Sequence, residues 1–124
     1  MMIQSMLIVG AGSFIGGALR FYISYLMKSL CAGGFPWGTL VVNLIGCLTF
    51  GIIYGWMSRF STPTSVGCLL LTTGLCGGFT TFSTFAFEGQ QLLQDGNVFS
   101  FIAYALTSVF VGILLVCLGI WMVK

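Results

Sequence analysis

The stretch GGFTTFSTF, residues 77–85, interrupts an otherwise apolar segment with a glycine pair, four hydroxyl side chains and three evenly spaced phenylalanines. Irregular backbone inside a bilayer is stable only where protein or a water-filled cavity surrounds it. The stretch therefore predicts a helix that is broken in the middle of the membrane. It is also the first candidate for a binding or permeation site.

The composition identifies an integral membrane protein. The chain has 124 residues, of which 58% are hydrophobic and 5% charged, and a soluble domain of this size could not shield so much apolar surface from water. A membrane-spanning helix needs roughly 20 mostly apolar residues. Such stretches occur at about residues 3–27, 37–57, 64–87 and 98–123. The expected fold is an all-α membrane protein with four transmembrane helices, the third one broken, in a single domain over residues 1–124.

Short turn sequences separate these stretches. Residues 33–36 read GGFP, Thr62-Pro63 is typical of a helix cap followed by a first-turn proline, and residues 95–97 read DGN. These connections leave no room for an aqueous domain. The amino terminus lacks the basic segment of a cleaved signal, so we expect the first stretch to be a retained helix.

The sequence lacks the residue types that most enzymes and metal clusters use. It has no histidine, its carboxylates are Glu88 and Asp95 near predicted helix ends, and no nucleophile–base pair can be assembled from them. The five cysteines form no CxxC pair, and those in apolar stretches are expected to be small buried hydrophobic side chains. We therefore expect no enzymatic activity. We expect the chain to lie in a lipid bilayer and to bind no nucleic acid.

The basic residues give almost no preference for one orientation in the membrane. With both termini on one side, Arg59 and Lys124 lie on that side, while Lys28 and Arg20 lie toward the other. A chain with so little bias could insert in both directions. Two oppositely oriented copies could then pair, which is the hypothesis of a dual-topology antiparallel homodimer.

Glycines at helical spacing predict close helix packing. Gly12 and Gly16 form one GxxxG pair, Gly51 and Gly55 form another, and the fourth stretch carries further glycines. Such small domains give little surface to enclose a polar path, so oligomerisation is expected. The spacing leaves open whether the glycines pack within one chain or between chains.

A few polar residues fall inside the apolar stretches. Each of them needs a hydrogen-bond partner in the protein or contacts an ion or molecule that crosses the membrane. Thr39 and Asn43 share one face of the second stretch, and Tyr104, Thr107 and Ser108 share a face of the fourth. Hydrogen bonding between helices explains isolated hydroxyls. Asn43 has a second explanation, because its amide can donate to an anion while its carbonyl is held elsewhere.

The third stretch presents two kinds of side chain. If the segment after Gly78 were helical, Thr80, Ser83 and Thr84 would cluster on one side with Phe82 and Phe85 nearly opposite. Hydroxyls supply O–H donors, and a phenyl ring is positive at its edge, so both can attract an anion without a fixed charge. The alternative is that the two rings only pack against lipid or neighbouring helices.

Arg20 has two interpretations of equal weight. It lies about 25 Å along the first helix, where its side chain could extend to the headgroups. It could instead line a wet vestibule and raise the local concentration of anions. Glu88, just after the phenylalanines, is either a solvated helix end or a vestibule residue, and the solvated helix end is the expectation.

Residues 77–85, with Arg20, Asn43 and Tyr104 in the other stretches, closely resemble the Fluc (CrcB) fluoride channels. The likeness covers the whole chain. It implies a fluoride-selective channel in the bacterial inner (cytoplasmic) membrane, built as a dual-topology antiparallel homodimer with two separate pores.

The resemblance also implies which residues form the sites. A central sodium ion is expected, held by the backbone carbonyls of Gly77 and Thr80 of each chain, and oxygen ligands without carboxylates suit such a monovalent cation. The residues that correspond to the fluoride pore are Asn43, Phe82, Phe85, Ser83, Thr84, Tyr104 and Arg20.

Two other classes of membrane protein remain as alternatives. A small multidrug-type exporter also has four helices, but its chemistry needs a carboxylate in the first helix, and residues 3–27 contain none. A non-transporting assembly subunit would leave the polar faces pointing only at each other. Measurements of fluoride efflux separate these alternatives from a channel.

Overall fold

The computed structural model describes residues 1–31, 33–60 and 66–123. Within these ranges, four helices are long and apolar enough to cross a membrane: Met2–Leu30, Trp37–Arg59, Val66–Gln94 and Val98–Met122. The predicted all-helical fold with four membrane-spanning segments is therefore confirmed. The cap and proline predicted at Thr62-Pro63, and the predicted start of the third helix at residue 64, lie outside the described residues.

The four spans differ in their regularity. The first two are single helices, α1 (Met2–Leu30) and α2 (Trp37–Phe60). The third consists of α3 (Val66–Cys68), the wider π-helical segment η1 (Leu69–Cys76), α4 (Gly77–Phe79) and, after a break, α5 (Phe82–Gln94). The fourth consists of α6 (Val98–Leu106), a π-helical segment η2 (Thr107–Val111) and α7 (Gly112–Met122). The predicted break in the third helix is confirmed, and the π-helical segments are of a kind that often marks functional sites.

The third span is longer than the hydropathy predicts, because α5 continues to Gln94 rather than ending at residue 87. Leu92 accounts for the difference. Its side chain is buried in a cluster with Leu40 and Tyr104, so a tertiary contact keeps this more polar segment helical. The turn predicted at residues 95–97 follows directly, with Gly96 at a φ of +80° that favours glycine.

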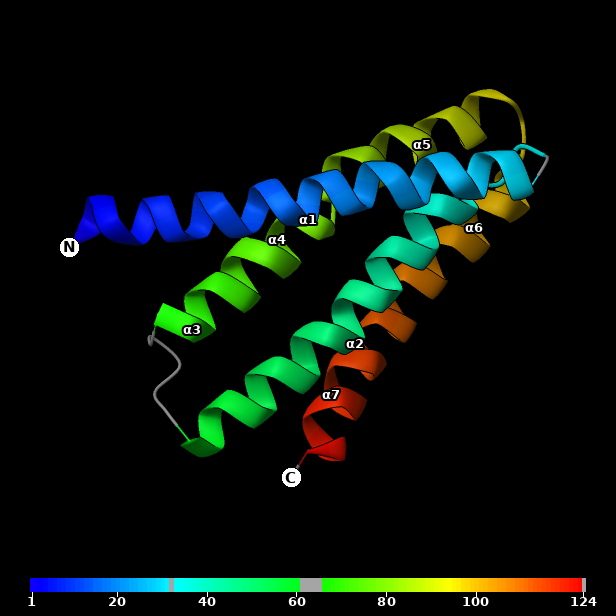
Figure 1. Cartoon of the computed structure of the whole chain (residues 1–124). Helices are drawn as coiled ribbons and strands as arrows, with labels where there is room; N and C mark the ends of the chain where they lie inside the picture. Colours follow the sequence, from blue (N-terminus) through cyan, green and yellow to red (C-terminus); the bar gives the residue numbers. More distant parts are fainter. Residues whose placement is uncertain (32, 61–65, 124) are drawn as a thin grey trace.

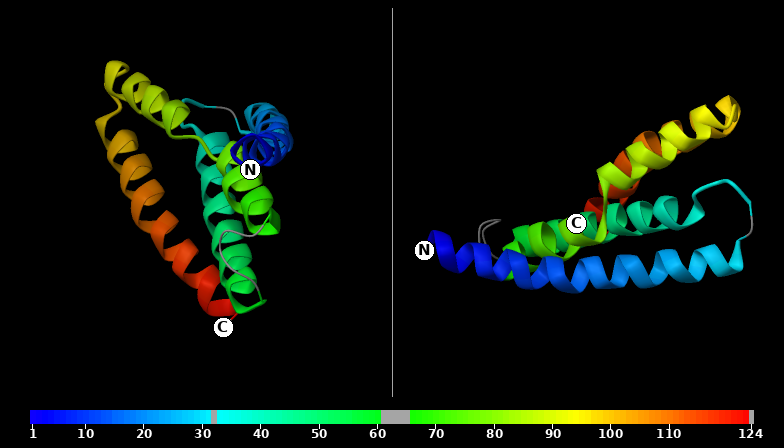
Figure 2. Two further views of the ribbon diagram at one scale, coloured as in Figure 1. Left: turned by 90° about the vertical axis from the view of Figure 1, so that its left-hand side faces the viewer. Right: turned by 90° about the horizontal axis from the view of Figure 1, so that it is seen from above.

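The helices form two layers that diverge from each other (Figure 1). α2 packs along α7, while α1 packs on η1 and α4. Figure 2 shows that α5 leaves the layer of α1, α3 and α4 after the break and ends beside the start of α6. The break in the third span therefore connects one layer to the other.

Glycines make the close contacts within each layer. A Cβ added at Gly12 would lie 2.6 Å from Leu70 O in η1, and one at Gly119 would lie 2.6 Å from Leu48 O in α2. A Cβ at Gly16 would overlap Leu75 O, and one at Gly51 would overlap Val116 O. These glycine faces are thus occupied by packing within one chain, which answers the question that the sequence left open.

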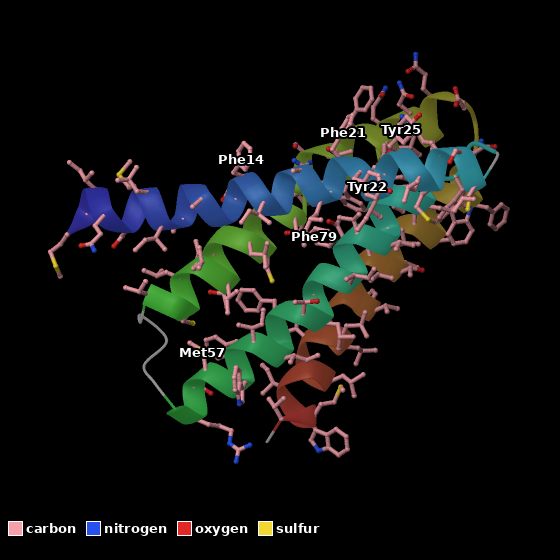
Figure 3. The ribbon with its side chains drawn as sticks, viewed as in Figure 1. Phe14, Phe21, Tyr22, Tyr25, Met57 and Phe79 are labelled. Atoms are coloured by element: carbon pink, nitrogen blue, oxygen red, sulfur yellow. The ribbon has the colours of Figure 1, made fainter. Side chains whose placement is uncertain are left out.

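The two ends of the chain lie away from the end of the molecule where α1 finishes and α2 begins (Figure 1). Arg59 donates from Nη1 to the carbonyl of Val123 at 2.6 Å, so the end of α2 and the end of the fourth span lie at the same membrane face. On the outer side of α1, Phe14 and Tyr25 project away from α2, as side chains facing lipid do (Figure 3).

Candidate functional site

The break in the third span lies at Thr80 and Thr81, two residues after the glycine pair. Gly77 has ordinary helical angles, φ −63° and ψ −38°. Thr80 (φ −86°, ψ 160°) and Thr81 (φ −151°, ψ 126°) are extended, and α5 starts at Phe82. Gly77 and Gly78 therefore do not turn the backbone, since α4 stays helical through both of them.

Asn43 of α2 holds the extended segment in place. Its Nδ2 donates to Thr81 O at 3.0 Å, and its Oδ1 accepts from Thr81 N–H at 2.8 Å. One side-chain amide thus bonds to both backbone polar groups of Thr81. Nδ2 carries two hydrogens, and the second has no partner among the described residues, so Asn43 retains one donor for an anion.

The hydroxyl cluster centres on Thr81. Thr81 Oγ1 caps α5 by accepting from Thr84 N–H at 3.3 Å, and it lies 3.2 Å from Thr84 Oγ1 and 3.5 Å from Ser83 Oγ. Thr80, which the helical projection grouped with Ser83 and Thr84, points elsewhere: its Oγ1 donates to Cys76 O at 3.0 Å. That projection is wrong at Thr80 because Thr80 and Thr81 are extended and do not follow the helical period.

The diverted donors leave carbonyl groups available at the break. In a continuous helix, Thr81 N–H would bond to Gly77 O and Thr84 N–H would bond to Thr80 O. These two donors go instead to Asn43 Oδ1 and Thr81 Oγ1. Gly77 and Thr80 also line a common pocket of about 280 Å³ with Gly46 and Cys47. Neutral oxygens of this kind fit the sodium ion that the resemblance implies.

The two candidate pore phenylalanines lie side by side just after the break. Their ring centroids are 5.7 Å apart with the planes tilted by 45°, and Phe85 lies 5.0 Å from the ring of Tyr104. Phe82 is 78% exposed within the single chain, although it belongs to the middle of a membrane span. The chain alone therefore leaves one side of this aromatic pair uncovered.

Tyr104 connects the aromatic pair to a carboxylate. The side chain is fully buried, and its hydroxyl donates to Glu88 Oε1 at 3.3 Å. Glu88 is not the solvated helix end that the sequence predicted, because α5 continues beyond it. One turn along the fourth span, Ser108 Oγ is buried and has no hydrogen-bond partner in the described part of the chain.

A depression with mixed polar and apolar lining leads from the surface to the break. We call it the vestibule, and it combines a pocket of about 650 Å³ with a smaller one of about 180 Å³. Both are lined by Ser24, Thr39 and Thr84. The larger pocket reaches Glu88 and the smaller one Thr81, so the vestibule extends from the α1–α2 end of the molecule to the hydroxyl cluster.

Arg20 lines the smaller pocket of the vestibule. α1 continues ten residues past it to Leu30, about 15 Å, which places Arg20 well inside the helix rather than at its end. Its Nε is buried without a hydrogen-bond partner among the described residues. This position favours the vestibule interpretation of Arg20 over extension to the headgroups.

The whole of this arrangement lies within the segment matched by one family model. The model, described as "CrcB-like protein, Camphor Resistance (CrcB)", matches residues 7–120. The chain belongs to the CrcB-like family.

Individual members of the CrcB-like family are similar over almost the full chain. The fluoride-specific ion channel FluC of Phocaeicola vulgatus is 44% identical over 119 residues, which cover 96% of this chain and 98% of the relative. The protein of the same name from Leptospira interrogans is 38% identical over 121 residues, 98% of this chain and 95% of the relative. The protein of the same name from Chlorobium phaeobacteroides is 42% identical over 124 aligned positions, which cover 97% of this chain and 93% of the relative. Together with the four spans, these bacterial relatives make the chain a multi-pass membrane protein.

The structure adds residues that sequence reasoning missed in this CrcB-like chain. Thr81 is hydrogen-bonded to Asn43 and Thr84 at the break, yet nothing in the sequence separates it from Thr80. Phe35, in the α1–α2 connection, lies with its ring 5.6 Å from Tyr104 in an edge arrangement. The Gly-Gly-Phe-Pro pattern indicates a turn at this point, and only the fold shows that its phenylalanine reaches the fourth span.

Asn43→Asp is expected to destabilise the break. The variant keeps an acceptor for Thr81 N–H but places an anionic oxygen where Nδ2 now donates to Thr81 O. An unsatisfied buried polar group costs about 1–3 kcal/mol, so the melting temperature in detergent should fall clearly at neutral pH. The matched control is Asn97→Asp, the same change at an exposed helix N-terminus, which should melt like the unmodified protein. Equal melting of the two variants would contradict the role of Asn43.

Proposed function

We propose that the protein is a fluoride-selective ion channel that conducts F⁻ passively across the bacterial cytoplasmic membrane. Fluoride enters a cell as uncharged HF and dissociates inside, and a negative membrane potential would then drive the anion out through the channel. The relatives that match nearly the whole chain are named as fluoride-specific ion channels, not as enzymes. The observation that carries the proposal is the vestibule, whose inner pocket ends at Arg20 and the hydroxyls of Thr81 and Thr84. The amide of Asn43 is hydrogen-bonded to Thr81 at this point.

These groups suit a small, strongly hydrated anion. The second N–H of Asn43 and the hydroxyls of Ser83 and Thr84 are hydrogen-bond donors close to one another, and Thr81 Oγ1, which donates to Thr84 Oγ1, holds the hydroxyls together. Phenyl edges add weak positive potential without a fixed charge, so the ion can be bound and still leave. Arg20, at the inner part of the vestibule, raises the local anion concentration.

A second copy of the chain completes each pore in this proposal. The Ser83 hydroxyl is exposed beside Phe82, and a polar group that faces lipid is costly, so a second copy of the chain would cover the open side of the break. The near balance of basic residues between the two membrane faces supports a partner inserted in the opposite direction. Two breaks in such an antiparallel homodimer give two pores.

Sodium has a defined place in the proposal. The carbonyls of Gly77 and Thr80 of both copies would hold it. The bound ion would supply the positive charge that these carbonyls lack, because Thr81 N–H and Thr84 N–H donate to Asn43 Oδ1 and Thr81 Oγ1 instead. A proton-coupled exporter finds no such support, since α1 contains no carboxylate.

The test is anion release from liposomes that contain the purified protein. With a potassium gradient and valinomycin to balance charge, a fluoride electrode should record rapid fluoride release, while chloride-loaded liposomes should behave like protein-free ones. Equal release of the two anions would refute selectivity. Absence of fluoride release would refute the channel and leave the non-transporting alternative.

A further inference from the structure

Gly46 lies where α2 comes closest to the break. It is three residues after Asn43, hence on the same face of α2, and it is buried. A Cβ added there would overlap Cγ2 of Thr80 and lie 3.3 Å from Cδ2 of Phe79. α2 therefore meets the break at two neighbouring points, a hydrogen-bonded one at Asn43 and a steric one at Gly46.

The side chain of Thr80 is fixed on both of its branches. Oγ1 donates to Cys76 O at 3.0 Å, and the methyl group occupies the space above Gly46. A β-branched side chain has few χ1 alternatives, so these two contacts together set the position of the Thr80 backbone.

The peptide group between Thr80 and Thr81 then has one orientation. Its N–H donates to Asn43 Oδ1 at 2.8 Å. In a trans peptide the C=O points opposite to the N–H, and the described chain contains no cis peptide. The Thr80 carbonyl is thereby directed away from Asn43. Thr80 itself lines the 280 Å³ pocket together with Gly46 and Gly77.

We propose that Gly46 is a positioning residue for the cation site: its missing side chain makes room for the methyl group of Thr80, and this contact directs the Thr80 carbonyl toward sodium. The inference rests on the proposed sodium site. In this proposal Gly46 of α2 does not touch the ion. It orients the Thr80 carbonyl, a sodium ligand on the third span.

The test compares sodium binding in four proteins: the unmodified chain, Gly46→Ala, Thr80→Ser and the double variant. Thr80→Ser removes the methyl group and keeps the hydroxyl that bonds to Cys76 O. Each protein is titrated in detergent with NaCl at constant ionic strength, balanced by N-methylglucamine chloride. The readout is the sodium-dependent rise in melting temperature, which follows binding to the folded state.

Gly46→Ala is expected to weaken the apparent affinity for sodium about tenfold, since overpacking of one methyl group costs on the order of a kcal/mol. The double variant should recover to within about threefold of Thr80→Ser, because the added methyl then has space. Gly10→Ala is the control, as a Cβ at that position meets nothing within 4 Å. Unchanged affinity in Gly46→Ala, or no recovery in the double variant, would overturn the inference.

The sodium titration can be separated from the measurement of fluoride release. If Gly46→Ala alone cannot be purified, recovery of a folded, sodium-responsive double variant supports the steric contact, and failure of both refutes it. An unmodified protein that melts at higher temperature with sodium but releases no fluoride would refute conduction and not the role of Gly46. A conducting protein without any sodium response would refute the role of Gly46 and not conduction.

Discussion

Phe82→Ile is expected to reduce fluoride release from liposomes to the level of protein-free vesicles. Isoleucine fills a similar apolar volume but has no ring edge with positive potential, so the anion loses the contact that replaces part of its hydration shell. Phe85→Ile should have the same effect on release. The measurement is the initial rate at a fluoride electrode, together with size-exclusion chromatography to check assembly.

The two phenylalanine variants differ in a useful way. Phe82 is mostly exposed in the chain, so its replacement removes little internal packing, whereas Phe85 also contacts the ring of Tyr104 at 5.0 Å. Phe82→Ile is therefore the cleaner test of the ring edge. Phe14→Ile is the matched control on the lipid-facing side of α1 and should conduct normally (Figure 3). Normal fluoride release by Phe82→Ile would refute the role of the ring in conduction.

Gly16→Ala should destabilise the fold more than the same change at the other glycines of α1. The new Cβ would overlap Leu75 O and lie 2.7 Å from Phe79 N, and backbone atoms cannot move aside as a flexible side chain can. We expect a loss of about 1–3 kcal/mol or more in the free energy of unfolding, seen as a lower melting temperature and a lower yield of monodisperse protein.

Gly10→Ala provides the comparison on the same helix, because a Cβ at Gly10 meets nothing within 4 Å. This variant should express and melt like the unmodified protein. If Gly16→Ala melted at the same temperature as Gly10→Ala, the close packing of α1 on η1 and α4 would be wrong.

Hydropathy was sufficient to predict the spans and the existence of a break, because both follow from the cost of polar groups in lipid. The position of the break was not predictable in the same way. Glycines suggest a turn, yet Gly78 serves close packing, since a Cβ there would lie 2.6 Å from Ser13 Cα. The turn itself depends on hydrogen bonds between Asn43 and Thr81, which are 38 residues apart.

In the candidate site, too, some residues could be predicted from the sequence and others depended on tertiary contacts. Asn43, Phe82, Phe85 and Tyr104 could be selected from the sequence, because a polar residue in an apolar span or a repeated aromatic is visible there. The contact between Tyr104 and Glu88 was not visible, since hydropathy ended the third helix before α5 does and left Glu88 in solvent. The spatial role of Gly46 needs coordinates, because any glycine in a span looks alike in sequence.

The vestibule of the described chain lies at the end where α1 finishes and α2 begins. In the proposed antiparallel homodimer, two such openings would face opposite sides of the membrane. The pair would then offer the same mouth to the cytoplasm and to the exterior, and would need no machinery to orient it. The sign of the ionic current would depend only on voltage and concentration.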